Sequence, residues 1–127
     1  MTMLTLRAEA LLLDMDGTLV HSTTEVETVW RLWCQGHRLD PAPVLAMCHG
    51  VRSREVIRAL APQLDLAREV ALLDELEIQH AGVAEAVAGA RTLLAALAPD
   101  RWALVTSASQ RVARHRLASA GLPLPKL

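Results

Sequence analysis

Hydrophobic residues form two short continuous runs, separated by a long stretch in which they recur at helical spacing. Residues 7–13 end in an uninterrupted apolar run, and a second run covers residues 102–105. Continuous apolar runs of this length are typical of strands buried on both faces of a parallel sheet. Because a right-handed crossover joins such strands, we expect the two to be parallel neighbours. The pattern therefore predicts an α/β fold.

Helical spacing dominates the rest of the chain. We expect helices over residues 22–36, 41–48, 53–61, 65–80, 91–97 and 109–120. Hydroxyl residues at positions 22–24 should cap the first helix, and Gly82 to Gly89 is interpreted as a small-residue hinge. Residues 22–81 are too many for a simple connection, so we expect them to form a separate helical lobe.

Two carboxylates stand one residue apart where the first apolar run ends. Ligands of a parallel sheet collect at the carboxyl ends of its strands. There Asp14 would serve as a nucleophile or metal ligand, and Asp16 as an acid and base. Gly17 lets the turn close, so that successive N–H groups form an anion-binding nest. Capping of a turn is the plainer interpretation, but the preceding apolar run and the full D-x-D-G-T string favour chemistry on a phosphate.

The composition excludes several classes of function. A formal net charge of -1 argues against a dedicated nucleic-acid binder, which would be markedly basic. No segment reaches the roughly 20 apolar residues that a membrane span needs. Cys34 and Cys48 are isolated and lack metal-ligand or redox spacing, which indicates reduced thiols. We therefore expect a cytoplasmic protein that binds neither nucleic acid nor membranes.

Three segments resemble one known family. LLLDMDGTLV, at residues 11–20, resembles motif I of the haloacid dehalogenase superfamily, and LVTSAS, at residues 104–109, resembles its motif II. The helical insertion occupies the place of the family's C1 cap. HGVRS, at residues 49–53, is similar to a cap segment of sugar phosphatases and glycerol-3-phosphate phosphatases. The resemblance implies a Rossmann-like parallel-sheet core over 1–20 and 84–127, with an all-helical cap inserted over 21–83.

The resemblance also implies a mechanism for the acidic turn. Asp14 would attack phosphorus and form an aspartyl-phosphate intermediate. Asp16 would protonate the leaving alcohol and then activate the hydrolytic water. Mg²⁺ would be held by the Asp14 carboxylate and the backbone carbonyl of Asp16. The acid at position 16 also argues against dehalogenase activity, because dehalogenases of the family lack it.

Substrate contacts are expected from two further segments. Thr106 and Ser107 would bind the phosphate, and the sequence leaves open which of them is the motif II hydroxyl. Arg52 and His49 of the cap would contact the substrate, the plainer alternative being a solvated arginine at a helix start and a histidine at a helix end. Four basic residues after motif II are expected to form a solvated helix face: Arg111, Arg114, His115 and Arg116.

The chain departs from the family's pattern after motif II. The family needs a lysine for the phosphate and a downstream acidic motif for the metal. Lys126 is the only lysine, and no Asp or Glu follows Asp100. The core should also have five or more strands, whereas the pattern predicts two. We therefore expect a C-terminally truncated chain with an incomplete core, whose open strand edge favours self-association.

These observations predict a Mg²⁺-dependent phosphatase for a small sugar or polyol phosphate. A phosphosugar mutase with the same nucleophile is an alternative, as is a non-catalytic remnant or binding module. Because the lysine and the downstream acids are missing, we expect the 127-residue chain alone to be close to inactive.

Overall fold

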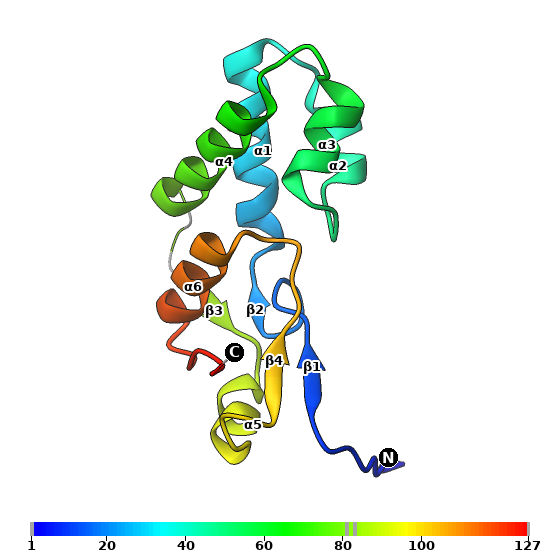
Figure 1. The fold of residues 1–127 in the computed structure, drawn as a ribbon, viewed down its shortest axis with the longest axis vertical. Coiled ribbons are helices and arrows are strands. Elements are labelled where there is room, and N and C mark those ends of the chain that lie inside the picture. Colours follow the sequence, from blue (N-terminus) through cyan, green and yellow to red (C-terminus); the bar gives the residue numbers. More distant parts are fainter. Residues whose placement is uncertain (1, 81, 83, 127) are drawn as a thin grey trace.

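The computed structural model describes residues 2–80, 82 and 84–126. Ten elements follow one another along the chain: β1 (Leu11–Leu13), β2 (Val20–His21), α1 (Thr23–His37), α2 (Pro41–Met47), α3 (Ser53–Leu60), α4 (Leu66–His80), β3 (Glu85–Ala86), α5 (Ala90–Ala96), β4 (Trp102–Leu104) and α6 (Gln110–Ser119). Helices α1–α4 gather at one end of the molecule, which we call the helical lobe (Figure 1). The strands, α5 and α6 form the strand lobe, in which α6 packs against α4 of the helical lobe. Every expected helix is present, with bounds that differ by at most one residue.

The two predicted strands are parallel neighbours, as expected. β1 pairs with β4, so that Leu11 lies opposite Trp102 and Leu13 opposite Leu104. Both strands are shorter than the apolar runs that predicted them. The expectation of burial on both faces is wrong for β1, because Leu12 is 75% exposed. One face of this two-stranded sheet carries no covering layer among the described residues.

A second, antiparallel pair of strands was not expected. Val20 of β2 pairs with Ala86 of β3, and His21 pairs with Glu85. The segment from Gly82 to Gly89, interpreted as a hinge, therefore contains β3, although its residue 83 lies outside the described residues. β2 leads into α1 and β3 follows α4, so this short ladder joins the two places where the chain passes between the lobes (Figure 1).

Each lobe encloses its own hydrophobic cluster. The cluster of the strand lobe includes Met15, Leu19, Val20, Leu94, Trp102, Leu117 and Leu122. The cluster of the helical lobe includes Val29, Trp30, Trp33, Val44, Val56, Ile57 and Leu73. Cys34 and Cys48 are free and buried in the helical lobe, as the sequence indicated. The residue boundaries expected for core and cap stay a prediction.

A buried carboxylate joins two helices inside the helical lobe. Glu69 of α4 accepts a hydrogen bond from the Trp33 indole nitrogen of α1 at 2.8 Å. His37 of α1 contacts the same carboxylate oxygen through Nε2 at 2.7 Å. These contacts fix α1 against α4, the helix that also reaches the strand lobe. No helix in the described ranges is long and apolar enough to span a membrane.

Candidate functional site

The acidic turn follows β1 directly, at the end of the parallel sheet. Gly17 has a φ of +79°, a left-handed conformation that side chains rarely adopt, and its N–H donates to the Val20 carbonyl at 2.8 Å. The Thr18 hydroxyl lies 3.5 Å from Oδ2 of Asp14. The turn thereby places Asp14 on the surface and Asp16 half-buried below it. The position of both acids on a glycine turn directly after β1 agrees with the D-x-D-G-T string, and the roles expected for the two acids stay predictions.

A small cavity of about 80 Å³ separates this turn from the helical lobe. Four of the predicted site residues line it: Asp14, Asp16, Ser107 and His49. The structure therefore brings both acids together with a residue after β4 and with one from the loop between α2 and α3. The carboxyl ends of β1 and β4 and the helical lobe meet at this point, which makes it the candidate site.

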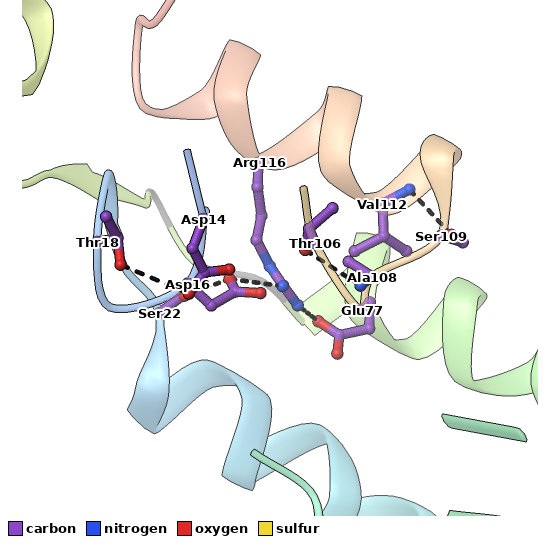
Figure 2. A network of polar contacts seen from close by, with 10 residues as sticks. All are labelled: Asp14, Asp16, Thr18, Ser22, Glu77, Thr106, Ala108, Ser109, Val112 and Arg116. Atoms are coloured by element: carbon purple, nitrogen blue, oxygen red, sulfur yellow. Dashed lines mark hydrogen bonds and ion pairs between the residues drawn. The ribbon is translucent and has the colours of Figure 1, made fainter. Parts of the chain in front are cut away.

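Thr106 and Ser107 differ in their surroundings. Ser107 lines the small cavity together with the two acids, whereas Thr106 is not among the residues that line it. The Thr106 hydroxyl accepts a hydrogen bond from the Ala108 backbone nitrogen at 3.1 Å (Figure 2). Ser109 caps α6 by accepting from the Val112 nitrogen at 3.2 Å. These two contacts fix the loop that presents Ser107.

The two residues expected from the cap occupy different positions. His49 lines the small cavity, but its side chain is 45% exposed and contacts Glu27 Oε1 at 2.9 Å. Arg52 is exposed at the start of α3 and lines a wider cleft of about 720 Å³. Thr106 and Ser107 line that same cleft. Arg52 is thus separated from the two acids but shares a cleft with the loop after β4.

Asp16 is held by two partners that the sequence did not assign to it. Arg116 Nη1 donates to Asp16 Oδ1 at 2.8 Å, and the Ser22 hydroxyl donates to the same oxygen (Figure 2). Ser22 therefore bonds to Asp16 and makes no side-chain cap for α1, contrary to expectation. The expected solvated basic face is wrong for Arg116, whose side chain is only 3% exposed.

Arg116 also reaches the helical lobe. Its Nη2 pairs with Oε2 of Glu77, a residue of α4 that the sequence analysis did not single out. The signal for a buried position 116 was its spacing, four residues after Val112 and four before Ala120, which are both buried. Nε of Arg116 is buried, and it has no hydrogen-bond partner in the part of the chain that the structure describes.

The charges around the cavity are predominantly negative. Burial raises the pKa of Glu77 above its usual range, and the neighbouring Arg116 offsets part of this effect. Three carboxylates (Asp14, Asp16 and Glu77) line the cavity with the guanidinium of Arg116. An anionic phosphate would meet net repulsion in such a site unless a further cation were bound.

The donor atoms suit part of a magnesium site. Mg²⁺ prefers oxygen ligands, keeps several waters and commonly uses one or two carboxylates together with substrate phosphate. The Asp14 carboxylate is exposed at the cavity, and the Asp16 backbone carbonyl lies in the same turn. Within residues 2–80, 82 and 84–126, no group of three or more His, Cys, Asp or Glu side chains that could hold a metal was found. The residues present therefore fit a partial set of ligands.

Comparison with known proteins identifies the family. The profile of the haloacid dehalogenase-like hydrolases matches residues 8–125. The chain belongs to this family. The resemblance of this chain to the haloacid dehalogenase superfamily is thus confirmed.

Two curated relatives and one solved structure extend this result. Hexitol phosphatase A of Escherichia coli is 39% identical over 127 residues, which cover 96% of this chain and 59% of the relative. 2-Deoxyglucose-6-phosphate phosphatase 2 of Saccharomyces cerevisiae is 32% identical over an alignment of 115 residues. That alignment covers 80% of this chain and 47% of the relative. A hydrolase from Pseudomonas syringae has the same fold, with a TM-score of 0.67 at 20% identity over 93% of this chain and 57% of that one. The haloacid dehalogenase-like chain thus spans about half the length of these relatives.

Proposed function

We propose that this protein is a Mg²⁺-dependent phosphomonoester hydrolase for a small sugar or polyol phosphate. The observation that carries the proposal is the convergence of Asp14, Asp16 and Ser107 on one cavity beneath the helical lobe. Similarity to a hexitol phosphatase and to a deoxyglucose-phosphate phosphatase supports the substrate class. The helical lobe would act as the cap, and a cytoplasmic location stays a prediction.

In this mechanism Asp14 is the nucleophile. One of its carboxylate oxygens forms a bond to phosphorus while the bond from phosphorus to the substrate alcohol breaks. Asp16 gives its proton to the leaving oxygen, then takes a proton from the water that releases inorganic phosphate from Asp14. Among the described residues, the side-chain hydrogen bonds of Asp16 go to Oδ1, so in this mechanism Oδ2 would transfer the proton.

Bound Mg²⁺, held by the Asp14 carboxylate and the Asp16 carbonyl, would offset the negative charge that accumulates around the phosphate. The chain supplies the other contacts itself. Ser107 would donate to the phosphate oxygens from its place beside the acids, and Thr106 would support the same loop. Arg52 and His49 would contact the part of the substrate that faces the helical lobe.

The missing family groups set the expected rate. No Asp or Glu follows Asp100, and Lys126 is the only lysine. Removal of one donor to developing charge typically lowers kcat by about 10²–10³-fold. We therefore expect the 127 residues by themselves to hydrolyse phosphomonoesters very slowly, unless further chain or a partner completes the site.

The decisive experiment measures release of inorganic phosphate from a hexitol phosphate and from a hexose phosphate, with Mg²⁺ and with chelator. Asp14→Asn, which is nearly isosteric, is the test variant, and Glu75→Gln on the exposed face of α4 is the matched control. Where further chain or a partner completes the site, we expect Mg²⁺-dependent release that Asp14→Asn abolishes and the control retains; from the 127 residues alone we expect the same pattern at a far lower rate. Release that survives Asp14→Asn would contradict the assigned nucleophile, and transfer of phosphate within the sugar would support a mutase.

A further inference from the structure

Arg116 links three parts of the molecule through one side chain. It lies on α6 of the strand lobe, donates to Asp16 of the acidic turn and pairs with Glu77 on α4 of the helical lobe (Figure 2). Its side chain is 3% exposed, and that of Glu77 is 14% exposed, so the bridge is largely shielded from water. A planar guanidinium suits this geometry because its forked donors can bind two carboxylates at once.

A second contact shows that Asp16 is fixed from both sides of the junction between the lobes. The Ser22 hydroxyl, immediately before α1, donates to the same Oδ1 that Arg116 binds. Rotation of the helical lobe away from the strand lobe would therefore strain or break contacts that orient this carboxylate. Closure of the lobes and orientation of Asp16 depend on the same set of hydrogen bonds.

We propose that Arg116 is a positioning residue that latches α4 to the acidic turn, so that Asp16 is correctly oriented only when the helical lobe is closed. This inference rests on the proposed function for the role of Asp16, but the latch itself stands on the ion pairs alone. Nε of Arg116 is buried and has no hydrogen-bond partner among the described residues, so the guanidinium is held through its two terminal nitrogens.

The same two helices provide an internal control. Arg111 of α6 pairs with Glu75 of α4, but both side chains are about half exposed and neither lines the cavity beside Asp16. Exposed ion pairs contribute little to stability because solvent screens them. Loss of this outer pair should therefore leave the latch intact, whereas loss of the Arg116 bridge should open it.

Two native cysteines report the opening. Cys48 is buried at the end of α2 and lines the cavity between the lobes. Cys34 is buried in the interior of the helical lobe and is not among the residues that line the cavity. Opening of the lobes should expose Cys48 alone, whereas unfolding of the helical lobe should expose both thiols.

The experiment measures the alkylation rate of each cysteine by mass spectrometry under native conditions. The chain is compared with Arg116→Lys, Glu77→Gln and the control Glu75→Gln. We expect both latch variants to raise the ratio of Cys48 to Cys34 labelling about tenfold, and the control to leave it unchanged. An unchanged ratio in both latch variants, or equal acceleration of the two cysteines, would overturn the latch.

The two latch variants separate opening from a change in thiol ionisation. Burial, and then neighbouring acids that include Glu77, raise the pKa of Cys48, so Glu77→Gln by itself favours the reactive thiolate. Arg116→Lys keeps both formal charges and lacks only the forked geometry. Acceleration confined to Glu77→Gln would therefore be an electrostatic effect and would count against the latch.

Kinetics distinguish positioning of Asp16 from simple structural support. In a sample with measurable phosphatase activity, Arg116→Lys should lower kcat about tenfold or more, because Asp16 loses one of the two partners that orient it. Glu77→Gln keeps the bond between Arg116 and Asp16, and bound substrate can still draw the lobes together, so this variant should mainly raise KM and lower kcat less than Arg116→Lys does. An equal loss of kcat in both variants, with KM unchanged, would contradict positioning. If no phosphomonoester is hydrolysed by any sample, the proposed function fails, while the labelling ratio still decides the latch.

Discussion

The two lobes differ in how completely each covers its own apolar residues. In the helical lobe, Val29, Trp33 and Ile57 are at most 1% exposed. In the strand lobe, Leu12 and Val105 are 75% and 57% exposed beside the parallel pair of strands. The strand lobe nevertheless carries both acids of the candidate site. Packing is thus most complete in the lobe that would shape the substrate pocket, and least complete in the lobe that would perform the chemistry.

The largest effect should come from the strand lobe and concern activity alone. Asp14→Asn removes the proposed nucleophile from an exposed position, so we expect turnover to fall by about a thousandfold or more. The free energy of unfolding should change little, since this side chain is exposed and the one side-chain hydrogen bond that it makes with the described residues, from Thr18, is long. Phosphate release measures the loss of turnover, and urea denaturation of the same sample measures the free energy of unfolding. A marked loss of stability would contradict the division of roles between the lobes.

The next largest effect concerns the stability of the helical lobe. Trp33→Ala leaves a large cavity in the cluster and removes a hydrogen bond to buried Glu69, so we expect a loss of about 3–5 kcal/mol. Leu12→Ala, in the exposed face of β1, should change the free energy of unfolding by less than about 0.5 kcal/mol. Urea denaturation of the two variants measures the contrast. Similar losses would mean that both lobes are equally well packed.

A smaller effect is expected at the junction between the lobes, and it depends on pH. Because the pKa of Glu77 is raised in the folded chain, this carboxyl holds its proton to higher pH when folded than when unfolded. The stabilisation that protonated Glu77 provides is therefore fully present below the ordinary glutamate pKa. It is lost as the pH rises through the pKa that Glu77 has in the folded chain. Stability measured from acidic to neutral pH should fall less steeply in Glu77→Gln than in the unchanged chain. A steeper fall in the variant would contradict the direction of the shift.

The smallest expected effect on stability comes from a change in the exposed face of β1. The same change should have a measurable effect on self-association of the chain. Leu12→Lys places a charge on the uncovered face of β1, and charged residues on exposed strands oppose edge and face contacts between chains. If the chain self-associates through this face, sedimentation velocity should show a shift of the variant toward monomer. Leu93→Lys, on exposed α5, is the matched control. Equal sedimentation of Leu12→Lys and the unchanged chain would exclude this face as the contact.

Sequence periodicity was sufficient for the helices and for the parallel strands. Long amphipathic segments such as 65–80 repeat the helical pattern several times, so their existence is well determined. The ladder of β2 and β3 has two residues in each strand, too few for any pattern, and it forms because the chain leaves and re-enters the strand lobe at one place. The pattern of neighbouring residues therefore cannot predict a pairing between such short strands.

The candidate site shows the same division between local and distant information. Asp14, Asp16 and Gly17 are neighbours in the chain, and their string alone predicted the acidic turn. The contact between Asp16 and Arg116 joins residues that are 100 positions apart, and Glu77 reaches the same guanidinium from a third segment. The spacing of Arg116 from Val112 and Ala120 was a sequence signal for its burial, but the two carboxylates that it binds follow only from the packing of α6 against α4 and the acidic turn.

The ladder between β2 and β3 has a consequence for how this protein can diversify. The strands that lead into and out of the helical lobe lie next to one another, since Val20 of β2 pairs with Ala86 of β3. An inserted segment whose two ends meet can change in length or shape without moving the strands that carry it. Under the proposed function, substrate preference can therefore evolve in the insertion while the acidic turn keeps its geometry. Selection on the pocket and selection on the chemistry can act on separate parts of the gene.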